Sequence, residues 1–400
     1  MSLIKDSFLY IFGEVLSKGM PYVLLPFITN SLGVEDYGRL AYFQVIVALV
    51  IIIVGLSQDG AISRYFYNYG VRSVHIIIIT GAGYSIVLSL LLISVLGLIN
   101  LDREYIFCVG AAFVSATLSA QLSFRQCLRD IKTYLLIQIS NAALTTFFVV
   151  VFFVFFKPSV IFYFSAVIIS GLLSLSIAYY LFFCKFKIRK VNFKNEKRSL
   201  LYLFSFGFPL VFHQLSLFAK GQVDRLFVYG QYGLKELGVY SLGIQIATVY
   251  SVLIIAVNKA ILPYYFNALK TNRLNVKGIL KYVYISFSFC FIPALVAFFI
   301  PGEWYKTIFG HGFDNVKYFV VFFVFSFGLN IPYLLMVNYF FYIGETSTIS
   351  KVTFLSSLLY IVILYFLSGI DLKYLPFSLL ISNLFMLLLF YKIILNRRAI

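Results

Sequence analysis

Residues 74–99 read VHIIIITGAGYSIVLSLLLISVLGLI, a stretch without a single aspartate, glutamate, lysine or arginine. It is long enough for a membrane-spanning helix, which needs roughly 20 mostly apolar residues. Similar stretches recur along the whole 400-residue chain, separated by short polar interruptions. Hydrophobic residues make up 62% of the chain and charged residues 12%, and the mean hydropathy is +0.95. This leaves too little polar surface for a soluble globule, so we expect an all-α integral membrane protein.

The apolar stretches predict about twelve transmembrane helices. We expect them near residues 8–30, 38–58, 74–99, 104–124, 134–156, 160–183, 202–229, 237–258, 281–300, 318–342, 349–367 and 374–394. The first stretch carries Glu14 and Lys18 and leads to no small-residue cleavage site, which favours a retained span over a signal peptide. The cysteines and histidines are scattered, so we expect no disulfide framework, metal site or cofactor.

Basic residues concentrate in alternate connections, which by the positive-inside rule places both termini in the cytoplasm. Examples are Arg64, Arg72, Arg125, Arg129, Lys132, Lys270, Arg273, Lys277 and Lys281. The longest hydrophilic stretch, KFKIRKVNFKNEKR from Lys185 to Arg198, has seven cations against one acid. It predicts an N-terminal six-helix bundle (1–184), a basic cytoplasmic linker (185–200) and a C-terminal six-helix bundle (201–400). The linker is either a solvated segment held at anionic headgroups or a dedicated partner-binding segment.

The two halves resemble each other. GVEDYG at residues 33–38 matches GLKELG at 233–238, and AISRYFYN at 61–68 matches AILPYYFN at 260–267. Because six is an even number of crossings, two such copies enter the membrane in the same direction, which implies a pseudo-two-fold axis along the membrane normal. The alternative to a duplication is that the two halves use glycine and aromatic residues at their helix ends independently.

Charged residues inside the predicted spans are candidate functional groups, because a charge near the bilayer centre costs about 2.5–3.5 kcal/mol. Glu14 and Lys18 share one face of the first span, and His213, Lys220 and Asp224 share one face of the seventh. Each lysine is expected to be held by the carboxylate one turn away. Asp59, Arg225 and Lys259 lie nearer span ends. These residues form either structural ion pairs and snorkelling side chains or a cationic lumen for an anionic headgroup.

Short motifs give the chain a family resemblance. They are LP at residues 25–26, LG at 32–33, YG at 37–38, RYF at 64–66, DR at 224–225 and LGVY at 237–240. With these motifs the chain resembles the O-antigen flippases, the Wzx proteins of the polysaccharide transporter family. That family belongs to the MOP superfamily, together with multidrug and toxin extruders (MATE transporters) and the lipid II flippase.

The resemblance implies a twelve-helix, two-lobed MATE-like fold in the bacterial inner membrane. Such proteins move undecaprenyl-diphosphate-linked oligosaccharides between leaflets by alternating access, without catalysing a covalent reaction. The partners implied are the lipid-linked oligosaccharide, membrane lipids, and polysaccharide polymerase and assembly proteins. A cationic lumen of this family would correspond by position to Lys18, Lys220, Arg225 and Arg64.

Other function classes fit less well. The chain has no nucleotide-binding loop, dinucleotide fingerprint or nucleophile elbow, so we expect neither an enzyme nor a primary pump. Membrane topology explains the net charge of +17 better than nucleic-acid binding does. A MATE-type multidrug or cation antiporter is the alternative transporter, and it should have an acid-rich lumen. A scaffold for polysaccharide assembly is a third reading, which leaves the intramembrane charges unexplained.

Overall fold

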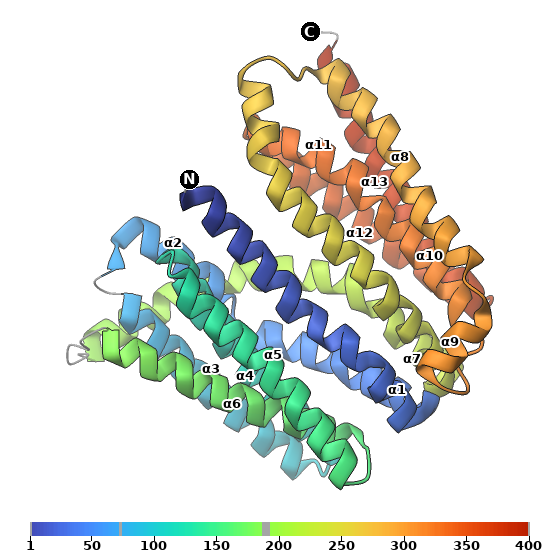
Figure 1. Cartoon of the computed structure of the whole chain (residues 1–400). Helices are drawn as coiled ribbons and strands as arrows, with labels where there is room; N and C mark the ends of the chain where they lie inside the picture. Colours follow the sequence, from blue (N-terminus) through green and yellow to red (C-terminus); the bar gives the residue numbers. More distant parts are fainter. Residues whose placement is uncertain (1, 72–73, 186–192, 399–400) are drawn as a thin grey trace. The chain divides into compact units, whose positions relative to one another are not determined.

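A computed structural model describes residues 2–71, 74–185 and 193–398. Within these ranges it leaves undescribed the side chains of residues 2–12, 14–15, 185, 193–194 and 397–398. The helices in the first half are α1 (Ser2–Gly55), α2 (Gln58–Tyr69), α3 (Val74–Leu98), α4 (Arg103–Cys127), α5 (Ile131–Phe155) and α6 (Val160–Lys185). Those in the second half are α7 (Phe193–Lys270), α8 (Val276–Phe299), α9 (Gly302–Phe309), α10 (Val316–Gly328), α11 (Asn330–Tyr342), α12 (Thr346–Ser368) and α13 (Leu375–Arg398). Figure 1 shows their course.

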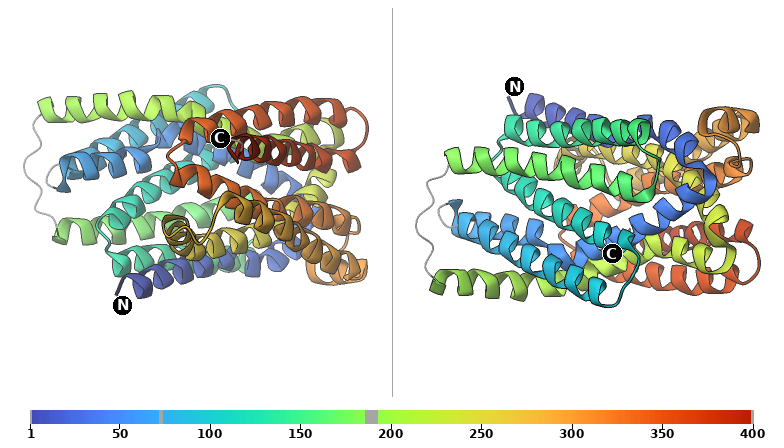
Figure 2. Two further views of the ribbon diagram at one scale, coloured as in Figure 1. Left: turned by 90° about the horizontal axis from the view of Figure 1, so that it is seen from above. Right: turned by 90° about the horizontal axis from the view of Figure 1, so that it is seen from below.

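In the described part of the chain, ten helical segments are long and apolar enough to cross a membrane. Two of them, Leu16–Tyr69 and Asn195–Lys270, are far longer than a bilayer requires. Each contains one glycine with a non-helical backbone, Gly33 (φ 74°, ψ 177°) or Gly233 (φ 82°, ψ −175°). The chain turns sharply there, as Figure 2 shows for α1, and each long segment therefore provides two spans. When the two second arms are counted as separate spans, the number of spans in the described residues rises from ten to twelve, as the sequence predicts.

Two further breaks have local causes. The second arm of α1 ends at Gly55, and Leu56 and Ser57 both have positive φ angles, 45° and 51°, before α2 begins. The tenth expected span is divided into α10 and α11 at Leu329. Pro332 follows three residues later and has no N–H to donate to the carbonyl of Gly328, so the regular helical bonding is interrupted.

Contacts between Cα atoms divide the chain into two compact units. The first contains residues 1–24 and 39–218, and the second contains residues 25–38 and 219–400. This grouping differs from the division at residues 184 and 201 expected from the sequence. The first arm of α7 belongs with the first unit, where Leu203 is part of the buried core. The turn of α1 belongs with the second. The sequence-based domain boundaries themselves stay a prediction.

The first unit is held together by α4, which packs against α2, α3, α5 and α6. Its larger core cluster includes Ile62, Ile77, Phe124 and Phe182. In the second unit α8 packs on α10 and α11, and α12 packs on α13. The core of that unit includes Cys290, Met336, Phe340, Phe390 and Ile394.

The turn of α1 is anchored within the second unit by the segment around α9. Asn30 donates its side-chain N–H to the carbonyl of Ile308 at 2.8 Å, and it also donates to the carbonyl of Pro26 at 2.7 Å. The ring of Tyr37 packs edge-on against Phe313, with centroids 5.9 Å apart. These contacts fix the backbone on both sides of Gly33.

The two matching glycine segments meet within the second unit. A Cβ atom added to Gly38 would lie 1.9 Å from the carbonyl oxygen of Leu234, and one added to Gly238 would lie 2.1 Å from that of Val34. The two contacts are equivalent under exchange of residues 33–38 with residues 233–238. This local two-fold relationship supports the internal repeat that the sequence predicts.

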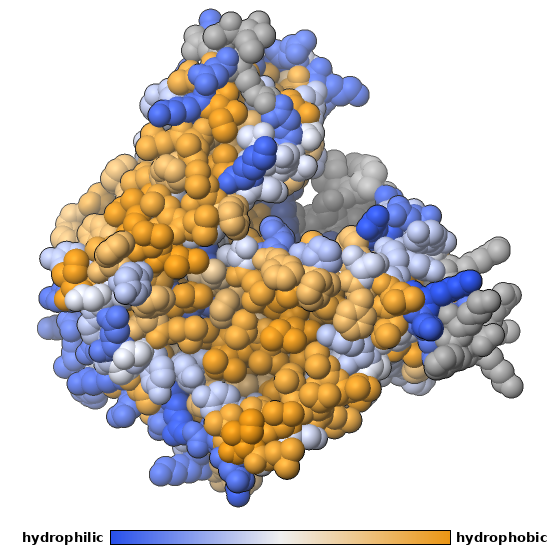
Figure 3. All heavy atoms as spheres, turned by 180° about the vertical axis from the view of Figure 1, so that it is seen from behind, coloured by the Kyte–Doolittle hydropathy of each residue, from blue (hydrophilic) through white to orange (hydrophobic). Residues whose placement is uncertain are grey.

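Large apolar side chains are exposed on most helices, as suits a protein whose solvent is lipid. On the face shown in Figure 3, hydrophobic residues form broad continuous areas with hydrophilic residues at their margins. The structure confirms the expected fold class.

Candidate functional site

A cluster of charged and hydroxyl side chains lies inside the second unit, on α7 and the helices packed around it. Lys220, Asp224 and Arg225 come from the same two turns of α7. Asp224 and Arg225 are buried, with 5% and 9% of their surface exposed, and Lys220 is partly buried. We call these three residues the α7 cluster. Its net formal charge is +1, since it has two cations and one carboxylate.

Lys220 is bonded to a hydroxyl group. Its ammonium group donates to Ser356 Oγ of α12 at 2.8 Å. Ser356 Oγ in turn donates to the carbonyl of Ser382 in α13 at 2.9 Å, and Ser356 and Ser382 are fully buried. The lysine is thus fixed to α12 and α13 through a neutral chain of hydrogen bonds. Ser356 does not neutralise its charge.

Asp224 has other partners than Lys220, although the two residues lie one turn apart. Tyr240 donates its hydroxyl to Asp224 Oδ2 at 2.8 Å, and the backbone N–H of Arg225 donates to Oδ1 at 2.9 Å. The Tyr240 ring lies edge-on to the rings of Phe319 and Phe323 in α10, both at 5.3 Å between centroids. The sequence predicted an ion pair between Asp224 and Lys220, but in the structure each of the two groups is bonded to other partners. Burial explains the difference, since a carboxylate away from water needs donors on both oxygens.

Arg225 completes the cluster. Its Nη1 donates to Gln222 Oε1 one turn earlier, while its Nε is buried without a hydrogen-bond partner among the described residues. A guanidinium has five donors, so this group retains capacity for an additional acceptor.

The other residues singled out by sequence lie elsewhere on their helices. Lys18 and His213 are exposed on the first unit's parts of α1 and α7, and the side chain of Glu14 is outside the described residues. Arg64 is exposed on α2, and its guanidinium lies 5.0 Å from the ring centroid of Phe206. Asp59 and Lys259 are exposed as well. Their place in a common lumen stays a prediction.

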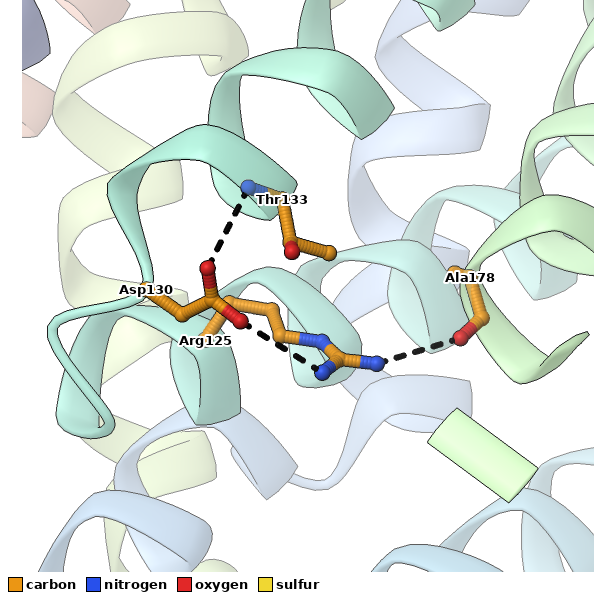
Figure 4. Close-up of polar contacts among 4 residues, drawn as sticks. All are labelled: Arg125, Asp130, Thr133 and Ala178. Atoms are coloured by element: carbon orange, nitrogen blue, oxygen red, sulfur yellow. Dashed lines mark hydrogen bonds and ion pairs between the residues drawn. The ribbon is translucent and has the colours of Figure 1, made fainter. Parts of the chain in front are cut away.

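The sequence predicts that Arg125 lies in the connection after the fourth span, whereas the structure places it in the last turn of α4 with its side chain completely buried. Figure 4 shows its guanidinium beneath the turn between α4 and α5. Nη2 donates to the carbonyl of Ala178 in α6 at 3.3 Å, and Nη1 lies 4.0 Å from Asp130 Oδ2. Asp130 also caps α5 by accepting from the backbone N–H of Thr133 at 3.4 Å. The sequence signal for this helix cap was the aspartate itself, because an aspartate just before a helix typically accepts a hydrogen bond from the backbone N–H three residues later.

The family model for polysaccharide biosynthesis proteins matches residues 3–269, well over half of the chain. The chain belongs to this family. A protein of the Lsg locus of Haemophilus influenzae is 36% identical over 393 residues, covering 98% of both chains. A second H. influenzae membrane protein is 37% identical over 397 residues, covering 98% of this chain and 97% of that protein. The family predicted from the motifs is confirmed.

Solved structures agree at the level of the fold. A MATE transporter of Vibrio cholerae superposes with a TM-score of 0.65 at 15% identity, covering 100% of this chain and 98% of that one. A MOP superfamily transporter of Pyrococcus furiosus superposes with a TM-score of 0.65 at 15% identity, covering 99% and 96%. This member of the polysaccharide biosynthesis family is therefore a multi-pass membrane protein with the fold of the MATE transporters.

Proposed function

We propose that this chain moves an oligosaccharide linked through diphosphate to a polyisoprenoid lipid across the bacterial inner membrane by alternating access. Membership of the polysaccharide biosynthesis family and the transporter fold both support this reading. Diphosphate and sugars cannot cross about 30 Å of hydrocarbon unaided, so the protein has to supply a polar and cationic path.

The observation that carries the proposal is the bonding of Lys220. An ammonium group in a partly buried position is costly unless an opposite charge is near, yet its bonded partner is the neutral Ser356. A phosphate oxygen could replace that hydroxyl as the acceptor and would form a shorter, charge-assisted bond. The α7 cluster would then gain a negative charge to balance its net positive one.

This exchange gives the substrate different contacts in the loaded and empty states. Without substrate, Lys220 is tied to α12 and α13 through Ser356. With a phosphate on Lys220, that tie would be released, so binding would bias the arrangement of these helices. Ligand affinity that differs between two arrangements is what shifts their populations.

Orientation is part of the same proposal. Cytoplasmic termini and a cytoplasmic 185–200 segment would place the most basic side of the protein where lipid-linked oligosaccharides are assembled. The segment from 186 to 192 lies outside the described residues, so its assignment rests on sequence alone.

The proposal is tested by deleting the gene in its native host and measuring surface polysaccharide. We expect loss of the polymer and accumulation of lipid-linked oligosaccharide that impermeant glycosidases cannot reach in spheroplasts. The wild-type gene and a Lys220→Arg variant should restore the polymer, because both carry a cation at this position. Unchanged surface polysaccharide in the deletion strain would contradict the proposal.

A cation antiporter is the second candidate, favoured by the buried Asp224 and by solved relatives described as multidrug resistance transporters. However, both oxygens of Asp224 already accept hydrogen bonds, and the α7 cluster has a net positive charge. The P. furiosus neighbour is described as having a binding pocket of reverse polarity that suggests a different function. Greater ethidium accumulation in the deletion strain, with normal surface polysaccharide, would favour the antiporter.

A further inference from the structure

A groove in the first unit lies between α3 and the beginning of α7. Its volume is about 660 Å³, and it is lined by Ile79, Thr80, Gly83, Tyr84 and Val87 of α3 and by Glu196, Lys197 and Leu200 of α7. The α3 residues recur every three or four positions, so they form one face of the helix. The α7 cluster lies in the other unit, and the transport proposal makes no use of this groove.

The groove is polar at one end and apolar at the other. Glu196 and Lys197 are exposed near the beginning of α7. Thr80 lies about 9 Å along α3 from its first residue, and Val87 lies about 20 Å along it. The Tyr84 ring packs edge-on to Phe204 with centroids 5.4 Å apart, and its hydroxyl donates to the carbonyl of Ile53 at 3.2 Å. Tyr84 therefore gives the groove a fixed wall.

Two features of the lining suit a lipid molecule. Most of it is apolar, with Ile79, Val87 and Leu200 along the groove. A Cβ added at Gly83 would meet no atom within 4 Å, so the middle of the groove is open. An acyl chain could lie along Gly83, Val87 and Leu200.

We propose that this groove binds a phospholipid with a zwitterionic aminoalkyl phosphate headgroup, phosphatidylethanolamine. The charges at its polar end determine this choice. Lys197 can bond the phosphate and Glu196 can bond the ammonium group, each through a charge-assisted contact. A purely anionic headgroup or a polyisoprenoid diphosphate would meet Lys197 but would offer Glu196 no cationic partner. The site is thus a lipid site distinct from the proposed path of the substrate.

The test uses the purified full-length protein, stripped of lipid and offered phosphatidylethanolamine, phosphatidylglycerol and phosphatidylcholine at equal concentrations. Native mass spectrometry measures retention. We expect phosphatidylethanolamine to be retained about fivefold over phosphatidylglycerol, which corresponds to one headgroup contact of about 1 kcal/mol. Phosphatidylcholine should be retained less, because its quaternary ammonium cannot donate a hydrogen bond to Glu196. Equal retention of all three lipids would overturn the proposal.

Variants locate the site. Gly83→Leu fills the groove and should lower phosphatidylethanolamine retention about fivefold, whereas Gly97→Leu should leave it unchanged. Gly97 is the matched control because it is on the same helix, outside the groove, and also has open space at its Cβ position. Glu196→Gln should abolish the preference over phosphatidylglycerol, and Lys197→Gln should weaken retention of both lipids. Both side chains are exposed, so the variants should fold. Wild-type retention of phosphatidylethanolamine in Gly83→Leu, or wild-type selectivity in Glu196→Gln, would overturn the assignment, and so would displacement of the bound lipid by a polyprenyl diphosphate.

Discussion

Gly38 and Gly238 face each other at a crossing of the short segments that follow Gly33 and Gly233, so closely that neither position has room for a side chain. The nearest atom to an added Cβ is the carbonyl oxygen of Leu234 in one case and of Val34 in the other. The two glycines differ in residue number by 200, and so do Val34 and Leu234, which is the spacing of the repeat. Backbone oxygens cannot swing aside as a flexible side chain can. The crossing therefore explains why both copies of the repeat place glycine here.

Replacing either glycine by alanine should destabilise the protein. In Gly38→Ala and Gly238→Ala the added methyl group has to displace backbone, and we expect a cost of about 1–3 kcal/mol, as for an overpacked core. Thermal unfolding in detergent measures it. Gly230→Ala is the control, because the same helix leaves open space there and alanine favours the helical state. Equal unfolding temperatures for all three variants would mean that the crossing is not close-packed.

The hydroxyl of Tyr240 should stabilise the buried Asp224. Tyr240→Phe keeps the ring against Phe319 and Phe323 but leaves one carboxylate oxygen without its donor, at a cost of about 1–3 kcal/mol. Tyr284→Phe provides the comparison, since that tyrosine is 63% exposed and its hydroxyl is bonded to the Tyr391 hydroxyl at 2.8 Å. We expect it to change stability by less than about 0.5 kcal/mol. A Tyr240→Phe variant as stable as Tyr284→Phe would refute the role given to this bond.

Asp130 should matter for stability beyond its role as a helix cap. Asp130→Ala removes the cap of α5, worth about 1 kcal/mol, and also the carboxylate nearest the buried guanidinium of Arg125. The matched change is Asp102→Ala at the start of α4, where the side chain makes no capping bond. Unfolding temperatures of the two variants should differ clearly, with Asp130→Ala the lower. The account of Arg125 fails if they are the same.

Cys184 offers a native probe of orientation. It is exposed, whereas Cys108, Cys127 and Cys290 are buried, and it directly precedes the basic 185–198 stretch. With cytoplasmic termini it faces the cytoplasm, so an impermeant maleimide should label inverted vesicles and spare spheroplasts. Cys184→Ser is the control that shows which residue is labelled. Labelling of intact spheroplasts at Cys184 would reverse the proposed topology.

Hydropathy and glycine patterns were sufficient to predict the membrane-spanning helices. Runs of apolar residues predicted the twelve crossings because a bilayer sets the length of each helix. The repeat at residues 33–38 and 233–238 predicted a symmetric arrangement, and the contacts of Gly38 and Gly238 agree with it. The exchange of helical segments between the two compact units was not predictable, because nothing in the residues of the first arm of α7 specifies which helices it packs against.

The site was predicted in part. The face shared by Lys220 and Asp224 was visible in the spacing, but their partners were not. Ser356 and Tyr240 are separated from them by 136 and 16 residues, and ordinary serines and tyrosines carry no signal of such contacts. The burial of Arg125 was not predicted, because a basic residue near a helix end usually lies in water, whereas packing of α4 against α6 encloses this one.

The most direct test of the transport mechanism measures translocation of a fluorescent oligosaccharide linked to a polyprenyl diphosphate in liposomes containing the purified protein. Lys220→Met preserves the length of the side chain and removes its charge. We predict that it loses at least about tenfold in initial rate, as expected for one lost charged contact of about 1.4 kcal/mol, while Lys220→Arg keeps most of it. Lys235→Met, at an exposed position of the same helix, should transport as wild type does. Transport by Lys220→Met at the wild-type rate, in a protein that inserts and unfolds normally, would contradict the role of a cation at this site.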